Sequence, residues 1–288
     1  MTGGDAQITD LAVDDHACLT YGEPEELLDL TAAFVRDGLS AALKVLWLSD
    51  SEPRGRVAAL GRRGIAVESA IADGQMAAMS DSRLLSDHTF TAAHAMDWLE
   101  AEMSASGRDG YPGLRVAIDM SWALRPVSGI EQLPEFEEGI AATLAGTRVS
   151  VLCQYDRDRF DPVTLASVAA FHTRSVAAAT YFADALLRIC RQYAPPGIRI
   201  AGELDFKAEE PLALALAEAI RYDGDLVVNM SALSFIDASC IRLIIEAARS
   251  LAQTRRVILQ CPAWIEGRFI LYGALQVPGI SLVRTHER

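Results

Sequence analysis

Side chains that could bind or react with a ligand lie in or after short apolar runs at three places before residue 160. They are His16, Cys18 and Tyr21, then Asp119, Ser121 and Trp122, and finally Gln154, Tyr155 and Asp156. Each group lies at or near the end of a predicted strand, and in an open parallel sheet these ends line the ligand crevice. The pattern predicts a small-molecule site formed by His16, Cys18, Tyr21, Asp119, Trp122 and Tyr155.

Each of these residues also has an ordinary structural explanation. His16 is typical of a strand cap, Cys18 of a core position and Tyr21 of packing on a helix, while Asp119 could cap the segment that follows it. An enzyme with Asp119 as acid or base is the competing class. No nucleophile, base and orienting group can be assembled from the spacing, so we expect a binding domain and no enzyme.

The turn after the first predicted strand differs from a phosphate-binding loop. It reads Tyr21-Gly22-Glu23-Pro24-Glu25-Glu26, without the GxxxxGK[ST] pattern and without a lysine. The order of the predicted elements is nevertheless that of phosphate-binding ATPases. A strand, a turn and a helix come first, and a strand that ends in Asp119 follows much later. Because three carboxylates repel a triphosphate, the sequence nevertheless predicts no ATP hydrolysis.

The cysteines indicate neither a metal site nor disulfides. Cys18, Cys153, Cys190, Cys240 and Cys261 have no CxxC spacing, which argues against structural zinc. The N-terminus, MTGGDAQITD, lacks the features of a signal peptide, which argues against a disulfide framework. We therefore expect buried thiols, no metal and no cofactor.

Length and charge restrict the partners. A chain of 288 residues with 51% hydrophobic composition is long enough for two cores. Its net charge is −13, and nearly all of this falls before residue 197, so we expect no nucleic-acid partner. No apolar stretch approaches the roughly 18 residues of a membrane span, and we expect a cytoplasmic protein without membrane contact.

Strand and helix patterns alternate in the first part of the chain. Strands are expected at residues 17–20, 44–48, 75–79, 115–118 and 149–153, and helices at 24–39, 88–104 and 129–145. This alternation predicts a mostly parallel sheet covered by helices. A helix is expected at 181–193, ended by Ala194-Pro195-Pro196-Gly197 as a short stiff linker. The predicted domains are residues 1–193 and 198–288, joined by the linker 194–197.

Several segments of the first domain carry a family resemblance. Five ordered segments resemble the MEDS domain over about residues 10–180. They are His16-Ala17-Cys18-Leu19-Thr20-Tyr21, the helix at 24–39, the strand at 44–50, Val116-Ala117-Ile118-Asp119-Met120 and Leu152-Cys153-Gln154-Tyr155-Asp156. That family is a presumed sensory module, named after methanogen and methylotroph proteins and a dichloromethane-responsive regulator. The resemblance implies a RecA-like, mostly parallel α/β sheet with a degenerate phosphate loop.

The second domain is organised around residues 225–252. Leu226-Val227-Val228 predicts a buried strand, Asp237 is a good helix N-cap, and apolar residues then repeat at helical spacing. With Gly202-Glu203-Leu204-Asp205 and the helix and strand patterns on either side, this unit resembles a STAS domain. The STAS family comprises anti-sigma-factor antagonists and sulfate-transporter tails, and the resemblance implies a small mixed sheet with helices.

In the STAS family the first hydroxyl after the aspartate is the phosphoacceptor, and a kinase that is also an anti-sigma factor phosphorylates it. In this chain Ala238 occupies that position and Ser239 follows it. The resemblance implies partner docking by Asp237, Ala238, Ser239 and Arg242, with Ser239 as the alternative phosphorylation site. A helix start could accept a phosphate, but we favour a docking surface controlled by the sensory domain.

The two resemblances and the residues together predict a cytoplasmic signalling regulator. Its sensory domain would control how an anti-sigma-factor-antagonist-like domain binds an anti-sigma factor or related protein kinase, that is, partner switching in transcription control. The alternatives are an enzyme that uses the acidic crevice and a scaffold component of a larger signalling assembly. A homodimer is an alternative to a monomer.

Overall fold

The computed structural model describes residues 6–49, 53–222, 224–251 and 254–285. The chain divides into two compact units, Met1–Ala177 and Ala178–Arg288. None of the helices within the described ranges combines the length and the apolar character needed to cross a membrane.

The first unit is built on a parallel sheet with the strand order β3-β2-β6-β7-β1-β8. Its strands are β1 (His16–Tyr21), β2 (Lys44–Ser49), β3 (Met76–Ser80), β6 (Leu114–Asp119), β7 (Val149–Asp156) and β8 (Arg174–Val176). Each neighbouring pair is parallel, which confirms the sheet that the alternating patterns predicted. Helices cover both faces, so the central strands are almost continuously apolar.

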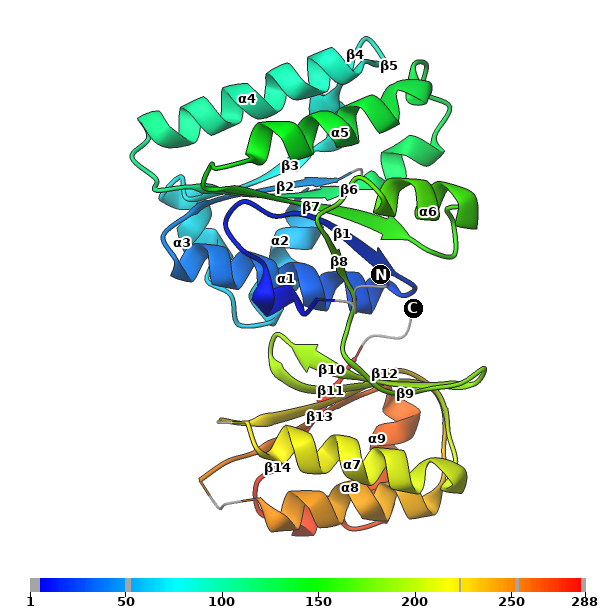
Figure 1. The fold of residues 1–288 in the computed structure, drawn as a ribbon. Coiled ribbons are helices and arrows are strands. Elements are labelled where there is room, and N and C mark those ends of the chain that lie inside the picture. Colours follow the sequence, from blue (N-terminus) through cyan, green and yellow to red (C-terminus); the bar gives the residue numbers. More distant parts are fainter. Residues whose placement is uncertain (1–5, 50–52, 223, 252–253, 286–288) are drawn as a thin grey trace. The chain divides into compact units, whose positions relative to one another are not determined.

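The helices of this unit lie on the two faces of the sheet (Figure 1). They are α1 (Pro24–Ser40), α2 (Pro53–Arg62), α3 (Val67–Ala72), α4 (Ala92–Arg108), α5 (Leu133–Leu144) and α6 (Pro162–Ala169). α1, α2 and α3 lie on one face, and α4 and α5 lie on the other. The sheet and α5 therefore enclose one side of the core, where the candidate site lies.

The start of α4 differs from the prediction of a helix from residue 88. The segment before it forms a small hairpin of β4 (Leu85–Ser86) and β5 (Thr89–Phe90). Thr91 caps the helix, because its hydroxyl accepts a hydrogen bond from the backbone N–H of His94 at 3.2 Å. His88, with φ of 62°, belongs to the hairpin turn.

Aromatic residues fill the core between the sheet and the α4–α5 layer. The rings of Phe90 and Trp122 lie 4.7 Å apart, and those of Phe90 and Phe136 lie 5.8 Å apart in an edge-to-face arrangement.

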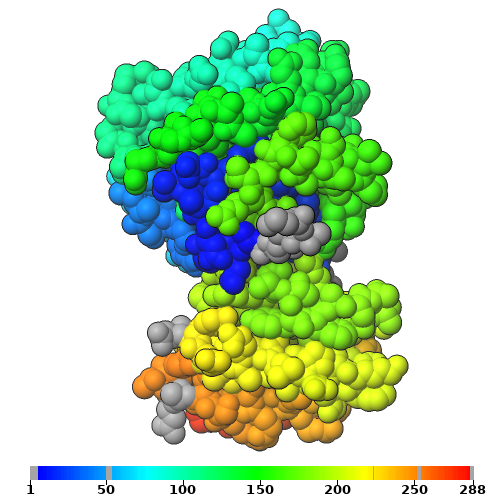
Figure 2. Space-filling view, in the orientation of Figure 1, coloured from blue at the N-terminus to red at the C-terminus, as the bar shows by residue number. Residues whose placement is uncertain are grey.

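In the space-filling view, the blue residues before β1 and the light green residues around β8 form adjoining parts of the surface (Figure 2). The start of β1 therefore packs beside the segment that contains β8.

The second unit contains a mixed sheet with the order β14-β13-β12-β11-β10-β9. Its strands are β9 (Thr180–Ala183), β10 (Leu187–Tyr193), β11 (Pro196–Leu204), β12 (Leu226–Ile236), β13 (Val257–Cys261) and β14 (Ile280–Arg284). β9, β10 and β11 are antiparallel neighbours, and the pairs from β11 to β14 are parallel. The helices α7 (Glu209–Ile220), α8 (Ala238–Ser250) and α9 (Ala263–Leu271) cover one face (Figure 1).

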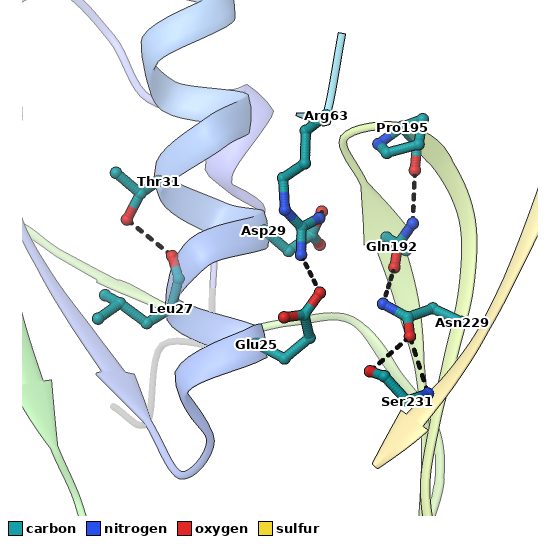
Figure 3. Close-up of polar contacts among 9 residues, drawn as sticks. All are labelled: Glu25, Leu27, Asp29, Thr31, Arg63, Gln192, Pro195, Asn229 and Ser231. Carbon is teal, nitrogen blue, oxygen red and sulfur yellow. Dashed lines mark hydrogen bonds and ion pairs between the residues drawn. The ribbon is translucent and has the colours of Figure 1, made fainter. Parts of the chain in front are cut away.

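The predicted helix at 181–193 and the predicted linker at 194–197 are both wrong. Residues 180–193 form β9 and β10, and Ala194-Pro195 closes a hairpin in which Tyr193 pairs with Pro196. The side chain of Gln192 joins this turn to β12, since its Nε2 donates to the carbonyl oxygen of Pro195 at 2.9 Å and its Oε1 accepts from Asn229 at 2.8 Å (Figure 3). The division between the units therefore lies at residues 177 and 178.

Candidate functional site

Four side chains with metal-ligating or acid–base groups meet between the sheet and α5 of the first unit. His16, Glu137, Cys153 and His172 each present one ligand atom, and these atoms all lie within 4.8 Å of one another. The side chains of His16, Glu137 and His172 are fully buried, as is Cys153. A buried group of this composition is rare without a ligand or a complete hydrogen-bond network. We call these four residues the Glu137 cluster.

Glu137 is the centre of the cluster. Its Oε2 lies 3.0 Å from Nε2 of His16 and 3.3 Å from Nε2 of His172. The sulfur of Cys153 lies 3.5 Å from both Oε2 of Glu137 and Nε2 of His16. The other carboxylate oxygen, Oε1, accepts a short hydrogen bond from the hydroxyl of Tyr155.

The topology of the sheet brings these residues together. His16 is the first residue of β1, and β1 lies between β7, which carries Cys153 and Tyr155, and β8. The backbone N–H of Thr173 donates to the carbonyl oxygen of His16 at 2.8 Å, which places His172 beside His16. The rings of His16 and His172 are 4.0 Å apart. Residues separated by more than 150 positions therefore become neighbours.

The charge at Glu137 is stabilised by its neighbours. Burial by itself raises the pKa of this carboxyl group, but its hydrogen bonds with His16 and Tyr155 help to outweigh burial and lower the pKa. Glu137 is therefore ionised. Burial, and then the negative charge of Glu137, raise the pKa values of the Cys153 thiol and the Tyr155 hydroxyl, and they raise the pKa of Cys18 to about 12.

The hydrogen-bonding geometry of His172 fixes its tautomer. Its Nδ1 lies 2.7 Å from the carbonyl oxygen of Val168, and because a carbonyl only accepts, Nδ1 carries the hydrogen. Burial lowers the pKa of His172 to about 4, although the charge of Glu137 acts in the opposite direction. Nε2 of the neutral ring then carries no hydrogen and presents a lone pair. Within the described residues it makes no hydrogen bond, and neither does Nδ1 of His16.

The structure separates the residues predicted to share one crevice. His16, Cys18 and Tyr155 lie in or beside the Glu137 cluster. The expectation that His16 lies near the carboxyl end of its strand is wrong, since His16 is the first residue of β1. Tyr21 and Asp119 end their strands and belong to a different group: burial and the charge of Asp119 raise the pKa of Tyr21 to about 12.

The carboxylate of Asp119, in this second group, forms an ion pair with an arginine. Asp119 Oδ2 lies 3.1 Å from the guanidinium of Arg56, which also lies over the Trp47 ring at 5.0 Å. Asp119 Oδ1 accepts the backbone N–H of Ser121 at 3.0 Å and so caps η3 (Met120–Leu124). Trp122, in η3, is fully buried against Phe90 and is a core residue in this structure.

A surface pocket of about 370 Å³ lies next to the Glu137 cluster. Its lining includes Leu124, Ile130, Pro134, Phe160, Thr164 and Val168. Phe160 packs edge-on against Tyr155 with ring centroids 5.1 Å apart, and Val168 supplies the carbonyl that binds His172. The pocket and the cluster therefore share neighbouring residues.

A carboxylate binds the turn where an ATPase would hold phosphate. Glu26 Oε2 accepts the backbone N–H of Gly22 at 3.1 Å and lies 3.5 Å from the guanidinium of Arg157. Arg63 forms ion pairs with Glu25 in the same turn and with Asp29 one turn further along α1 (Figure 3). The first turn of α1 thus carries its own anions at the positive end of the helix.

The predicted docking residues lie at the start of α8 in the second unit. Asp237 Oδ1 accepts the backbone N–H of Cys240 at 3.0 Å, which confirms the expected N-cap. The hydroxyl of Ser239 donates to the same oxygen at 2.8 Å. Arg242 is exposed on the next turn, with its guanidinium 5.8 Å from the ring of Tyr272.

Sequence reasoning missed Glu137 and His172. Glu137 left a signal: Leu133, Phe136, Ile140 and Leu144 form the apolar stripe of α5, and Glu137 lies within that stripe. His172 precedes β8 in a short loop and shows no periodic pattern. Its position became visible only once β8 was paired with β1.

Three known proteins show similarity to this chain, one in sequence and two in structure. The transcriptional repressor DcmR of Methylorubrum extorquens is 31% identical over 151 residues, which are 51% of this chain and 54% of the repressor, so the chain matches about half the length of that relative. A KaiC-like protein of Pyrococcus horikoshii has a TM-score of 0.45 and 13% identity over 66% of this chain and 79% of its own. The flagellar accessory protein FlaH of Methanocaldococcus jannaschii has a TM-score of 0.45 and 12% identity over 64% and 81%.

Two family models match the chain in the predicted order. The model of the methanogen/methylotroph, DcmR sensory domain, MEDS, matches residues 15–173, and it includes every member of the Glu137 cluster. The STAS domain model matches residues 193–265, which include β11, β12 and α8. The chain belongs to the MEDS family of sensory domains, and a STAS domain follows its MEDS domain.

Proposed function

We propose that this protein is a cytoplasmic, non-catalytic regulator in which the MEDS domain controls the binding of the STAS domain to a protein partner. The observation that carries the proposal is the presence of a sensory domain and a STAS domain in one chain. The similarity of the first unit to a protein named as a transcriptional repressor supports transcription as the controlled process.

The partner in this proposal is an anti-sigma factor or a related protein kinase. Its binding site is the α8 docking surface, defined as Phe206, Phe235, Asp237, Ala238, Ser239 and Arg242. Phe206 and Phe235 are 63% and 42% exposed, and large exposed aromatic side chains are typical of protein interfaces. The sulfur of Cys240 donates to the carbonyl oxygen of Asp205 at 3.2 Å, which holds the segment of Phe206 against the start of α8.

The sensed molecule binds the pocket beside the Glu137 cluster in this proposal. A volume of about 370 Å³ falls within the range of small-molecule sites. An occupant would touch Phe160 and Val168, which contact Tyr155 and His172. Ligand binding could therefore be transmitted to β1, β7 and β8 through the buried cluster.

The absence of ATP hydrolysis in this proposal is supported by the turn before α1. Glu26 already binds the backbone N–H of Gly22, and Arg157 is engaged by the same carboxylate. A triphosphate would have to displace this ion pair and approach Glu23 and Glu25 as well.

The test is binding by the full-length protein. The wild-type chain and an Arg242→Ala variant are immobilised and exposed to extract of the native cells, and bound proteins are quantified by mass spectrometry. Arg249→Ala is the matched control, because Arg249 lies on the same helix and pairs with Glu246 at the surface. We expect an anti-sigma factor or kinase that binds wild type and the control but not Arg242→Ala; equal binding to all three would contradict the assigned surface.

A further inference from the structure

We infer that the Glu137 cluster is a binding site for one divalent transition-metal ion of the zinc type, with His16, Glu137, Cys153 and His172 as its four ligands. The inference rests on the geometry of the buried cluster and is independent of any partner of the STAS domain. It replaces the expectation, drawn from cysteine spacing, that the chain has no metal site.

The distances fit a tetrahedral ion. Metal bonds of about 2.0–2.3 Å to nitrogen, oxygen and sulfur place neighbouring ligand atoms about 3.3–3.8 Å apart in a tetrahedron. The contacts of Glu137 Oε2 with His172 and Cys153, and of His16 with Cys153, measure 3.3, 3.5 and 3.5 Å. The His16 to Glu137 contact is slightly shorter, at 3.0 Å. The other two pairs, His172 with His16 and His172 with Cys153, have ligand atoms within 4.8 Å of each other.

One contact has the geometry of two ligand atoms that share an ion. The hydrogen on Nδ1 of His172 is donated to the carbonyl oxygen of Val168, and Nε2 of the same ring faces Oε2 of Glu137 at 3.3 Å. Nε2 makes no hydrogen bond within the described residues. A metal ion between the two atoms would form a bond with each. The bond from Nδ1 to a backbone carbonyl is also the arrangement that orients metal-bound histidines.

The charges also balance. A divalent ion bound to two neutral imidazoles, the Glu137 carboxylate and a Cys153 thiolate gives a site without net charge, which suits a buried position. In this reaction the Cys153 thiol loses its proton to solvent as the metal–sulfur bond forms, the hydrogen of His16 moves from Nε2 to Nδ1, and no electron is transferred. Imidazole and thiolate ligands favour zinc over magnesium or calcium.

The neighbouring cysteine offers an internal comparison. Cys18 lies opposite Cys153 in the paired strands β1 and β7, and both thiols are buried. Cys18 is nevertheless outside the group of four ligand atoms. A change at Cys18 alters the same part of the core but removes no proposed ligand.

The experiment uses the full-length protein after removal of metals with a chelator. Co²⁺ is titrated in and the absorption spectrum recorded, and Zn²⁺ is then added while the melting temperature is followed. We expect one equivalent of Co²⁺ with the intense visible bands of a tetrahedral ion and a thiolate-to-cobalt charge-transfer band. Zn²⁺ should displace it and raise the Tm.

Variants identify the ligands. Cys153→Ser should lose the charge-transfer band, and Cys18→Ser should keep it; His172→Gln should weaken Co²⁺ binding at least tenfold. X-ray absorption of the zinc-loaded wild-type protein should show one sulfur ligand, which tests the site even where a variant fails to fold. Absence of binding, a spectrum without a thiolate band, or equal spectra for the two cysteine variants would overturn the inference.

Discussion

The hydroxyl of Ser239 donates to the carboxylate of Asp237, with Oγ and Oδ1 2.8 Å apart at the start of α8. A phosphate on this hydroxyl would break the bond and place about two negative charges beside the carboxylate that caps the helix. We therefore predict that Ser239 is not phosphorylated in the cell. Mass spectrometry of protein from native cells should find the unmodified residue, and Ser239→Ala should bind the partner as wild type does.

The opposite pattern would restore a phosphoswitch. Stoichiometric phosphate on Ser239, together with loss of the partner by Ser239→Asp and retention by Ser239→Ala, would show that the serine has taken over the function of the position occupied by Ala238.

Removing the cap should destabilise the second unit. Asp237→Ala deletes the acceptor for the backbone N–H of Cys240, and we expect a loss of about 1 kcal/mol in the free energy of unfolding measured with urea. Burial raises the pKa of Asp237, but the hydrogen bonds from Cys240 and Ser239 outweigh burial and lower the pKa below its ordinary value. The stabilisation is therefore present above the unfolded pKa and lost as the pH falls through the folded value. An Asp237→Ala variant should show less of this acid sensitivity.

The first unit should not hydrolyse ATP. Glu26 occupies the backbone N–H of Gly22 at the turn before α1, and no lysine is present there. Phosphate release by the purified chain with ATP and Mg²⁺ should equal that of a buffer blank. Steady turnover that disappears in Asp119→Asn would disprove this and favour the enzyme alternative.

Glu137 should matter to folding as well as to ligand binding. Glu137→Ala leaves His16 and Tyr155 buried without their common acceptor, and removal of one partner from a buried charged network costs about 3–5 kcal/mol. The free energy of unfolding is measured with metal-free protein. Glu138→Ala is the matched control, since this neighbour is exposed and should change stability by no more than about 0.5 kcal/mol. Equal losses in the two variants would show that the buried network contributes no more than a surface carboxylate.

The boundary between the units can be tested with fragments. A fragment of residues 178–288 keeps β9 and β10 and should unfold in one cooperative transition. A fragment of residues 197–288 lacks both strands and leaves one edge of β11 unpaired, so it should be markedly less stable or aggregate. Equal stability of the two fragments would contradict the structural boundary.

Much of the fold was predictable because its patterns are local. The alternation of apolar strands with amphipathic helices predicted the parallel sheet, and Asp237 followed by Ile241, Ile244 and Ile245 predicted the start and buried face of α8. The error at residues 181–193 has a physical reason. Phe182, Ala185, Leu186 and Ile189 fit a helical spacing, yet the edge of β11 required a partner, and pairing with β10 overrode that local pattern.

The candidate site was predictable only in part because its residues meet through tertiary contacts. The sequence drew attention to His16, Cys18 and Tyr155, but the assumption that ligands gather at the carboxyl ends of strands joined them to Tyr21 and Asp119. The Glu137 cluster lies beside the opposite end of β1, where the carbonyl of His16 accepts from Thr173. A charge within the apolar stripe of α5 was the one local signal for Glu137.

The position of β1 between β7 and β8 has a consequence for protein synthesis. The ribosome makes β1 first, but the strands on both sides of it come from residues 149–156 and 174–176. During translation β1 must wait, unpaired, until β7 has left the ribosome, and β7 begins 128 positions after the end of β1 (149 − 21). Such long-range pairing slows folding and exposes the nascent strand to aggregation, so translation speed and chaperones should affect the yield of this domain.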